Sequence, residues 1–274
     1  MDRRVTPSNG RVAATHLKGQ LEALAYTDGA ARQLLAPFAD LTRTPQGPRD
    51  RQLQRGEAVT VFEEHDGSAF VQAAKDDHVG YLPSQTLTDP SAPNYRVAVR
   101  STHLYSLPDI KSPDLEALGF GARLRVLYEE KKFYAVEGGF VPKPHLRPLE
   151  QPFKDPVTIA QLHFGSPYLW GGNTVWGIDC SGLVQAALLA CDIACPGDSD
   201  LQEAALGVDV PADEPLKRGD MLFWKGHCGM MVDADTLIHA NAHHMAVAYE
   251  PVGAAIARIE AQGGGPVTSR KRLG

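Results

Sequence analysis

The first 35 residues place alanine and leucine among polar residues. Val12, Leu17, Leu21 and Leu24 fall at spacings that suit a short amphipathic helix. We therefore expect an N-terminal helical segment over residues 1–35.

Between residues 36 and 149 the pattern changes to short β-type runs separated by Gly, Pro and Asp, and this pattern occurs twice. The run that starts at Gly56 aligns with the run at Gly121, so that Val61 matches Val126. Gly80-Tyr81-Leu82-Pro83 aligns with Gly139-Phe140-Val141-Pro142, and a leucine follows four residues after each proline. Any two β-hairpins look alike in sequence, but the shared spacing from proline to leucine favours a true repeat.

Each copy has about 55 residues and four or five short strands, which is the size of a small SH3-like barrel. Alternating apolar residues such as Val59 and Val61 would bury one face of the sheet. The repeat therefore predicts two small all-β barrels, over residues 36–90 and 91–149.

Beyond residue 149 a third pattern begins. Residues 151–156, Gln-Pro-Phe-Lys-Asp-Pro, are typical of a linker, and residues 157–162 predict a short helix that the following glycine and proline end. A glycine-rich loop follows over residues 168–177. Asp179 can then cap a second helix, whose apolar residues fall on one face: Leu183, Val184, Ala187, Leu188 and Cys191.

The remainder of the chain predicts a meandering antiparallel sheet. Apolar runs separated by turns lie at residues 221–224, 228–232, 236–240, 245–249 and 267–273. Because helices come first and the sheet second, residues 150–274 predict an α+β domain.

The charge balance argues against a nucleic-acid partner. The 274 residues include 27 Lys and Arg against 33 Asp and Glu, a formal net charge of −6, and the one basic block is Arg270-Lys271-Arg272. Such a chain has little attraction for polyanions. No apolar run approaches the roughly 18–20 residues that span a bilayer, and the N-terminus lacks the apolar stretch of a secretory signal. We expect no membrane span and, for a complete chain, a cytoplasmic location.

All four cysteines, at 180, 191, 195 and 228, lie in the C-terminal part of the chain. This clustering is not a disulfide framework. It leaves three interpretations open: a metal site, one catalytic thiol with bystanders, or ordinary core residues.

Cys180 is the strongest candidate nucleophile. It falls in the first turn of a predicted helix, where free backbone N–H groups and the helix dipole stabilise a thiolate. His227 begins a predicted strand and can serve as the base, and His239 on the next strand can orient His227. The three follow the logic of a catalytic triad. A lone cysteine or strand histidine is more often a core residue, and we assign Cys191, Cys195 and Cys228 to packing.

Zinc is the alternative interpretation. His239 and His243 could supply ligands, with Cys228 and further histidines nearby. However, the chain has no Cys-x2-Cys pair, and the spacing from Cys191 to Cys195 crosses the predicted helix end. We therefore expect no metal and no cofactor.

Six motifs after residue 165 resemble, in the same order, those of the NlpC/P60 family of papain-like cysteine peptidases. They are Tyr168-Leu169-Trp170-Gly171-Gly172, Gly177-Ile178-Asp179-Cys180-Ser181-Gly182-Leu183-Val184, Asp198-Ser199-Asp200-Leu201-Gln202, Arg218-Gly219-Asp220-Met221-Leu222-Phe223, His227-Cys228-Gly229-Met230 and Leu237-Ile238-His239-Ala240. The Asp-Cys-Ser-Gly block and the later His-x-Gly block are specific. The likeness covers residues 150–274, and the two β-rich copies resemble bacterial SH3 domains. The resemblance implies a papain-like α+β catalytic domain preceded by two SH3-like barrels.

The resemblance also implies roles for single residues. Cys180 would be the nucleophile, His227 the base that returns its proton to the leaving amine, and His239 the residue that fixes the His227 tautomer. Tyr168 matches a family tyrosine whose hydroxyl, with the Cys180 backbone N–H, could stabilise the oxyanion.

Four further residues match positions that line the substrate cleft in the family: Asp179, Ser181, Asp198 and Ser199. A carboxylate such as Asp198 is suited to hold the free α-amine of a peptide that starts with L-Ala. Asp198 could equally be an ordinary helix cap, and the two roles are compatible.

This sequence departs from the family pattern in two places. Pro196-Gly197 stands where relatives often have Pro-Arg, so any contact of that arginine is absent. Cys228 replaces a residue that is more often β-branched, and it could be oxidised. In the first barrel, Glu57 and Tyr81 could contribute to a cleft wall, although a solvated glutamate and a core tyrosine are the simpler interpretation.

The whole arrangement is similar to γ-D-glutamyl-L-diamino-acid endopeptidases that trim cell-wall peptides for recycling. It predicts a cytoplasmic cysteine peptidase that hydrolyses the γ-D-glutamyl to diamino-acid bond of murein peptides with a free N-terminal L-Ala. One alternative is a non-catalytic wall-binding protein with a degenerate peptidase domain, which retention of all three triad residues disfavours. The other is a thiol-dependent acyltransferase or amidase on the same fold.

Overall fold

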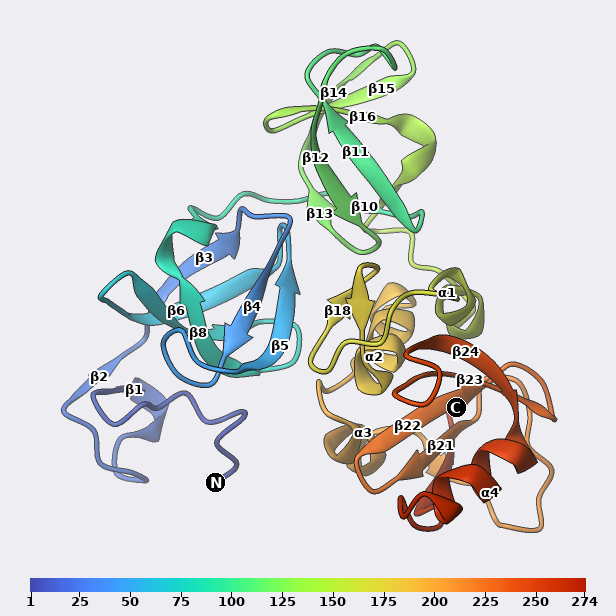
Figure 1. Ribbon diagram of the computed structural model, residues 1–274. Coiled ribbons are helices and arrows are strands. Elements are labelled where there is room, and N and C mark those ends of the chain that lie inside the picture. The colour runs from blue at the N-terminus through green and yellow to red at the C-terminus, as the bar shows by residue number, and fades with distance from the viewer. The chain divides into compact units, whose positions relative to one another are not determined.

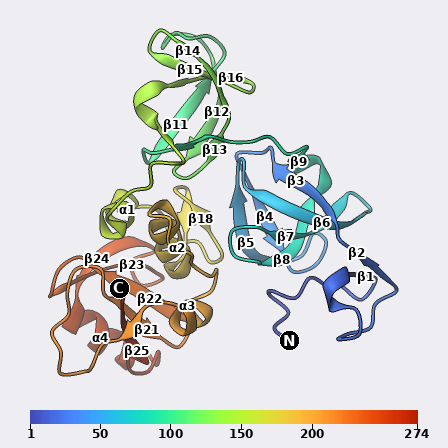
Figure 2. The ribbon, with the colours of Figure 1, turned by 180° about the vertical axis from the view of Figure 1, so that it is seen from behind.

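The computed structural model describes residues 1–274, which form two compact units, residues 1–151 and 152–274 (Figures 1 and 2). The first unit consists of strands and three short 3-10 turns. The second unit contains all four α-helices of the chain.

The N-terminal 35 residues are not an amphipathic helix, so this prediction is wrong. β1 (Val12–Ala14) and β2 (Ala25–Thr27) pair in parallel, with the 3-10 turn η1 (Thr15–Leu17) after β1. Gly10, Gly19 and Gly29 adopt positive φ angles, which interrupt any right-handed helix. The apolar side chains instead pack against strands of the same unit, in a cluster of Val12, Ala14, Leu17, Leu21, Phe62, Phe70, Val79 and Tyr81.

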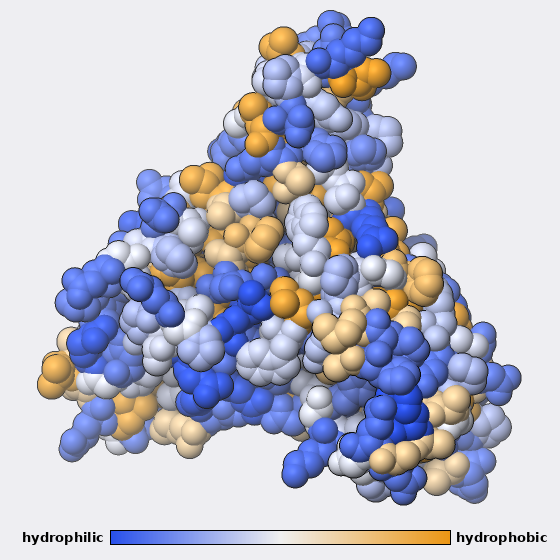
Figure 3. Space-filling view, viewed as in Figure 1, coloured by the Kyte–Doolittle hydropathy of each residue, from blue (hydrophilic) through white to orange (hydrophobic).

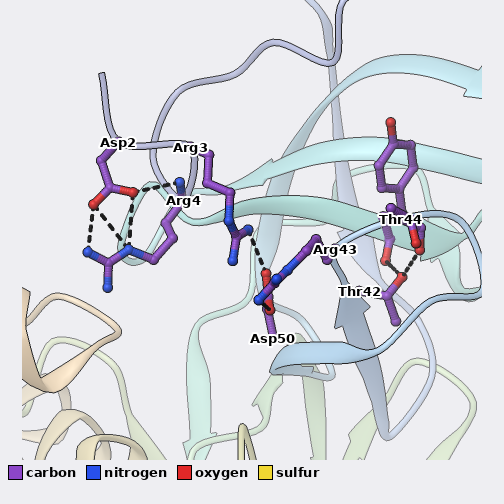
Figure 4. Close-up of polar contacts among 8 residues, drawn as sticks. Asp2, Arg3, Arg4, Thr42, Arg43, Thr44 and Asp50 are labelled. Atoms are coloured by element: carbon purple, nitrogen blue, oxygen red, sulfur yellow. Dashed lines mark hydrogen bonds and ion pairs between the residues drawn. The ribbon is translucent and has the colours of Figure 1, made fainter. Parts of the chain in front are cut away.

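An arginine pair also fastens the N-terminal segment (Figure 4). Arg3 and Arg43 contact opposite carboxylate oxygens of Asp50 at 2.8 and 3.0 Å. Burial would raise the pKa of Asp50, but hydrogen bonds from the two guanidiniums hold it below its usual value. One carboxylate therefore links the segment to the strands that follow.

The first β-rich region forms a seven-stranded sheet in the order β5-β4-β8-β7-β6-β3-β9. Its elements are β3 (Ala30–Leu34), β4 (Phe38–Thr42), β5 (Arg49–Gln54), β6 (Ala58–His65), β7 (Ser68–Ala73), β8 (Val79–Pro83), the turn η2 (Ser84–Thr86) and β9 (Leu87–Thr88). The core includes Leu34, Leu41, Leu53, Val59, Val71 and Leu82. Since β3 begins at residue 30, this sheet starts inside the predicted N-terminal segment.

The second β-rich region has a five-stranded sheet, β12-β11-β16-β15-β14, and a three-stranded sheet, β13-β10-β17. Its elements are β10 (Tyr95–Val97), β11 (Ser101–Tyr105), β12 (Asp114–Gly119), β13 (Arg123–Leu124), β14 (Val126–Glu130), β15 (Phe133–Val136), β16 (Gly139–Pro142), the turn η3 (Lys143–His145) and β17 (Leu146–Pro148). The core includes Val97, Leu104, Leu118, Val136 and Val141.

The two β-rich regions share a strand order. The run β5-β4-β8-β7-β6 of the first corresponds to β12-β11-β16-β15-β14 of the second. A β-bulge follows Val61 in β6 and Val126 in β14, the two residues that the sequence aligns. The aligned Gly56 and Gly121 also share positive φ angles of 76° and 88°. The sequence repeat therefore corresponds to a repeated topology.

The sequence suggested that Glu57 is a solvated surface residue, but its side chain is largely buried in an ion pair. Its carboxylate contacts Lys75 Nζ at 2.9 Å, and the two side chains are 12% and 7% exposed. Tyr81 packs on Phe70, with ring centroids 5.2 Å apart. Both residues thus have structural contacts within the first β-rich region.

The second unit is built on a six-stranded antiparallel sheet in the order β20-β25-β21-β22-β23-β24. Its elements are α1 (Pro156–Leu162), β18 (Asn173–Thr174), β19 (Gly177–Ile178), α2 (Cys180–Ala190), α3 (Ser199–Ala205), β20 (Val208–Asp209), β21 (Met221–Trp224), β22 (His227–Met231), β23 (Thr236–Asn241), β24 (Ala246–Pro251), α4 (Val252–Ala261) and β25 (Ser269–Arg272). α2 packs against β22 and β23. The predicted helices and strands occur close to their expected places.

α4 is a helix that the sequence did not predict, so the helices do not all precede the sheet. Its Ala255 and Ile259 pack with sheet residues in a cluster of Leu222, Trp224, Met231 and Leu237. α4 therefore covers the sheet face on which these four side chains lie.

The visible face in Figure 3 has hydrophobic residues in separate groups among hydrophilic ones. Scattered exposed apolar side chains are ordinary on protein surfaces. None of the helices combines the length and the apolar character that crossing a membrane requires.

A buried ion pair attaches β25 to the turn before β21. Arg272 donates from Nε and Nη2 to the two carboxylate oxygens of Asp220, each at 2.7 Å, and the Asp220 side chain is 1% exposed. Burial would raise the pKa of Asp220, but hydrogen bonds from Arg272 and the Lys217 backbone hold it below its usual value.

Asp220→Asn is expected to lower the free energy of unfolding at pH 7 by about 3 kcal/mol, because it removes the buried carboxylate that pairs with Arg272 and leaves this guanidinium with Glu214 alone. The folded-state pKa of Asp220 is depressed, so its contribution is present above the unfolded pKa of about 3.9 and is lost as pH falls through the folded pKa. Urea unfolding at pH 7 and at pH 3 measures both effects.

The matched control is Asp209→Asn. It removes the exposed charge partner of Lys271, the residue that precedes Arg272 in β25. The Asp209 side chain is 78% exposed and contacts Lys271 at 2.9 Å. Exposed ion pairs contribute little to stability. Equal destabilisation by the two variants would contradict the role given to Asp220.

Candidate active site

Cys180 is the first residue of α2, and Asp179 caps this helix as the sequence predicts. Asp179 Oδ1 accepts a hydrogen bond from the Gly182 backbone N–H at 2.6 Å. The first backbone N–H groups of a helix have no partner inside it, so Cys180 lies where a thiolate is stabilised.

The glycine-rich loop passes close to this helix start. Asp179 Oδ2 accepts from the Gly171 backbone N–H at 2.9 Å. A Cβ atom on Gly182 would lie 2.6 Å from the carbonyl oxygen of Gly172, a distance that real Cβ atoms do not reach. A glycine two residues after Cys180 therefore allows the loop to approach the nucleophile.

His227 and His239 lie on the neighbouring strands β22 and β23, as predicted. His227 Nε2 and His239 Nδ1 are 2.9 Å apart. His239 is completely buried and His227 is half-buried. A Cβ atom on Gly229 would lie 3.1 Å from the Cβ of His239, so the His-x-Gly spacing leaves room for the second histidine.

The Cys180 thiol lies within hydrogen-bonding reach of β22. Hydrogen bonds from the Cys228 thiol and from His227 lower the pKa of Cys180 well below its usual range, against the effect of burial. The structure thus brings Cys180, His227 and His239 together in one chain of contacts.

Cys228 does more than pack, contrary to the sequence-based assignment. Its thiol is completely buried, and its single S–H can donate either to Gln202 Oε1, 3.5 Å from Sγ, or to Cys180. Contact with Cys180 and burial raise the pKa of Cys228, so it stays a protonated donor beside the nucleophile. Cys195 is buried and Cys191 is half-buried, and all four cysteines are free thiols.

Gln202 connects three parts of the site and had no role in the sequence analysis. Its Nε2 donates to the carbonyl oxygens of Ser181 and Pro196, each at 2.9 Å, and the side chain is completely buried. A single glutamine in the sequence carries no pattern that would reveal these two contacts.

Tyr168 lies near the nucleophile. Burial, and then the charge of Cys180, raise the pKa of Tyr168 to about 12. The phenol is therefore protonated at neutral pH and can donate a hydrogen bond.

The four predicted substrate-binding residues lie at the starts of α2 and α3. Ser181 Oγ donates to Asp179 Oδ1 at 3.0 Å, and both side chains are buried. Asp198 occupies the N-cap position of α3 without a side-chain capping hydrogen bond, and Ser199 is the first residue of that helix. Their contacts with substrate stay a prediction.

Two residues behind His239 were not predicted. Glu250 Oε2 lies 3.1 Å from His239 Nε2, and Arg258 donates to the Glu250 oxygens at 2.9 and 2.7 Å. The predicted strand stopped at residue 249 and α4 was not predicted, so the sequence carried no signal for this pair.

The electrostatics of this group are well defined. Arg258 holds the pKa of Glu250 at about 2. Burial, and then the charge of His227, lower the pKa of His239 to about 3. At neutral pH, His239 is neutral and Glu250 is ionised.

One group of side chains could gather ligands for a metal. Ligand atoms of His239, His244 and Glu250 lie within 4.8 Å of one another. Both ring nitrogens of His239 already have partners, and Arg258 neutralises Glu250. A cation would have to displace these contacts.

Comparisons with known proteins agree with this geometry. Residues 165–258 match the model of the NlpC/P60 family, and residues 41–87 match that of the bacterial dipeptidyl-peptidase SH3 domain. A γ-D-glutamyl-L-lysine dipeptidyl-peptidase of Bacillus subtilis is 34% identical over 95 residues, which are 32% of this chain and 31% of that protein. The Bacillus cereus protein of the same name is 26% identical over 205 residues, which are 65% of this chain and 61% of that protein.

A solved structure also shares the fold. The crystal structure of an NlpC/P60 family protein from Bacillus cereus matches with a TM-score of 0.75 and 19% identity, over 89% of this chain and 99% of that chain. The two curated relatives are matched over only 31% and 61% of their own length. The chain therefore contains an NlpC/P60 domain at residues 165–258 and a bacterial SH3 domain of the dipeptidyl-peptidase kind at residues 41–87.

Proposed function

We propose that the second unit is a cysteine peptidase that hydrolyses the γ-D-glutamyl to diamino-acid bond of murein peptides. The observation that carries this proposal is the contact chain from Cys180 through His227 to His239, in which the pKa of the thiol is lowered. The names of the Bacillus relatives, γ-D-glutamyl-L-lysine dipeptidyl-peptidases, suggest the bond.

The reaction follows from the site residues. The Cys180 thiolate attacks the γ-carbonyl carbon, while its proton resides on His227. Tyr168 Oη–H and the Cys180 backbone N–H donate to the oxyanion. His227 protonates the leaving α-amine of the diamino acid, and a water that His227 then deprotonates hydrolyses the thioester.

We further propose that the substrate begins with a free amine. The Asp198 carboxylate lies at the N-cap position of α3 and carries the charge that an ammonium group requires. Asp179, Ser181 and Ser199 complete the proposed substrate-binding set. A dipeptidyl-peptidase of this kind would release L-Ala-γ-D-Glu.

Three finer features belong to the same proposal. The second β-rich region would be a second SH3-like barrel, because its strand order repeats that of the first. The second unit would be papain-like, and the protein would act in recycling in the cytoplasm, where the four free thiols stay reduced. Cell fractionation with an antibody to the chain tests the location.

A panel of peptides tests the function. L-Ala-γ-D-Glu-L-Lys and L-Ala-γ-D-Glu-meso-diaminopimelate, each with a free or an acetylated N-terminus, are incubated with the full chain, and products are followed by mass spectrometry. We expect release of L-Ala-γ-D-Glu, about 10–100-fold faster from the free peptides because of the charge-assisted contact with Asp198.

Each outcome decides one part of the proposal. Absence of cleavage overturns the peptidase assignment. Equal cleavage of free and acetylated peptides removes the amine requirement and leaves the peptidase. Transfer of the dipeptide to an added amine in place of hydrolysis would identify an acyltransferase.

A further inference from the structure

In the hydrogen bonds that link Glu250, His239 and His227, the charge of Glu250 determines which nitrogen atoms donate and which accept. An ionised carboxylate accepts hydrogen bonds and donates none. The ring nitrogen that Glu250 Oε2 contacts at 3.1 Å, His239 Nε2, must therefore carry the proton. Because His239 is neutral, its other nitrogen, Nδ1, has a lone pair and can only accept.

The same reasoning passes from His239 to His227. His239 Nδ1 lies 2.9 Å from His227 Nε2, so His227 Nε2 must be the protonated partner that donates. In neutral His227 the remaining nitrogen, Nδ1, is then unprotonated. This is the nitrogen left to contact Cys180.

We propose that Glu250 and Arg258 are positioning residues that fix the tautomers of His239 and His227, so that Nδ1 of His227 is the nitrogen that takes the proton of Cys180. The mechanistic part of this inference rests on the proposed peptidase function. The assignment of tautomers rests on the hydrogen-bond network alone.

Arg258 holds the Glu250 carboxylate in the orientation that faces His239. It donates to both oxygens of Glu250, from Nε at 2.9 Å and from Nη2 at 2.7 Å, which fixes the plane of the carboxylate. β24 pairs Glu250 with Leu237, and residues two apart on a strand point to the same face, so Glu250, Leu237 and His239 share a face. α4 covers the face that bears Leu237, and this packing places Arg258 next to Glu250.

The opposite tautomer would disable the base. If His239 carried its proton on Nδ1, His227 would have to accept at Nε2. Neutral His227 would then carry its own proton on Nδ1, where it could not take one from Cys180. If His227 were an imidazolium, it would donate from both nitrogens, and its Nε2–H would then face the N–H of His239 Nδ1.

Glu250→Gln is the variant that reverses the direction. Arg258 donates to the amide oxygen, which leaves the amide NH2 to face His239 Nε2. We expect kcat on L-Ala-γ-D-Glu-L-Lys to fall about 100-fold, the upper range for losing a partner that orients a functional histidine, with KM little changed. We also expect slower iodoacetamide labelling of Cys180 at pH 6, measured by mass spectrometry.

Glu203→Gln is the matched control in the same unit. The Glu203 carboxylate accepts a hydrogen bond from Ser269 Oγ at 2.7 Å and has no contact with either histidine. It should leave kcat and the labelling rate unchanged. Arg258→Lys, which keeps the charge but not the bidentate geometry, should lower kcat less than Glu250→Gln does.

The tautomers themselves can be measured in wild type, so the inference does not depend on a variant that folds. With ¹⁵N-labelled histidine, NMR should show a proton on Nε2 of His239 and a lone pair on its Nδ1. A proton on His239 Nδ1, or wild-type turnover and labelling in Glu250→Gln, overturns the inference. If wild type cleaves none of the peptides, the proposed function fails, while NMR and labelling still judge the tautomers.

Discussion

Replacing Cys180 with alanine is expected to abolish release of L-Ala-γ-D-Glu, with kcat/KM at least about 10⁴-fold lower, because no other group can form the thioester. Cys228 does not substitute, since its thiol has a raised pKa and stays protonated. Peptide cleavage followed by mass spectrometry measures the loss. The fold should persist, because one sulfur atom is removed at the start of α2.

Cys191→Ala is the matched control for this variant. Cys191 is half-buried at the C-terminal end of the same helix and should be dispensable for cleavage. Persistent activity in Cys180→Ala would show that the nucleophile lies elsewhere. Loss of activity in Cys191→Ala, with an unchanged melting temperature, would contradict the single-thiol mechanism.

The second large effect is expected for His227→Gln. This change removes the base and one hydrogen bond that lowers the pKa of Cys180. We expect kcat/KM to fall about 10³–10⁴-fold, the scale seen when a member of a nucleophile–base pair is lost. The pKa of Cys180 should rise toward its ordinary value of about 8.5.

The sign of the pH effect follows from this change. In wild type the thiolate persists at mildly acidic pH, so iodoacetamide should label Cys180 at pH 6. In His227→Gln the labelling rate at pH 6 should drop and recover only as pH approaches 8–9. The control is His65→Gln, an exposed histidine of the first unit that contacts Asp66. An unchanged labelling profile in His227→Gln would exclude His227 as the partner of Cys180.

The sequence was informative where chemistry depends on local patterns. A capping aspartate, a helix that begins at Cys180, and two histidines on paired strands are all short-range features, and the structure has each of them. The two β-rich copies were recognisable from the aligned glycine runs and the shared spacing from proline to leucine. The structure then repeats the bulge after Val61 and Val126 and the positive φ at Gly56 and Gly121.

The sequence was uninformative where a contact joins distant residues. Glu250 reaches His239 only because β23 and β24 pair in a particular register, and Arg258 reaches Glu250 from a helix without a clear start signal. The contact of Cys228 with Cys180 likewise depends on how α2 lies against β22. The N-terminal prediction failed because apolar spacing alone ignored three glycines in left-handed conformations.

The position of β25 has a practical consequence for work with isolated fragments. β25 lies between β20 and β21 in the sheet, yet it comes from residues 269–272, beyond the 165–258 range of the family match. A fragment cut to the matched range would open the edge of β21 to pairing with other chains, which favours aggregation. It would also strand a buried carboxylate at Asp220 and shorten α4 before Ile259. Fragments intended to retain an ordered Cys180 site should therefore extend through Arg272.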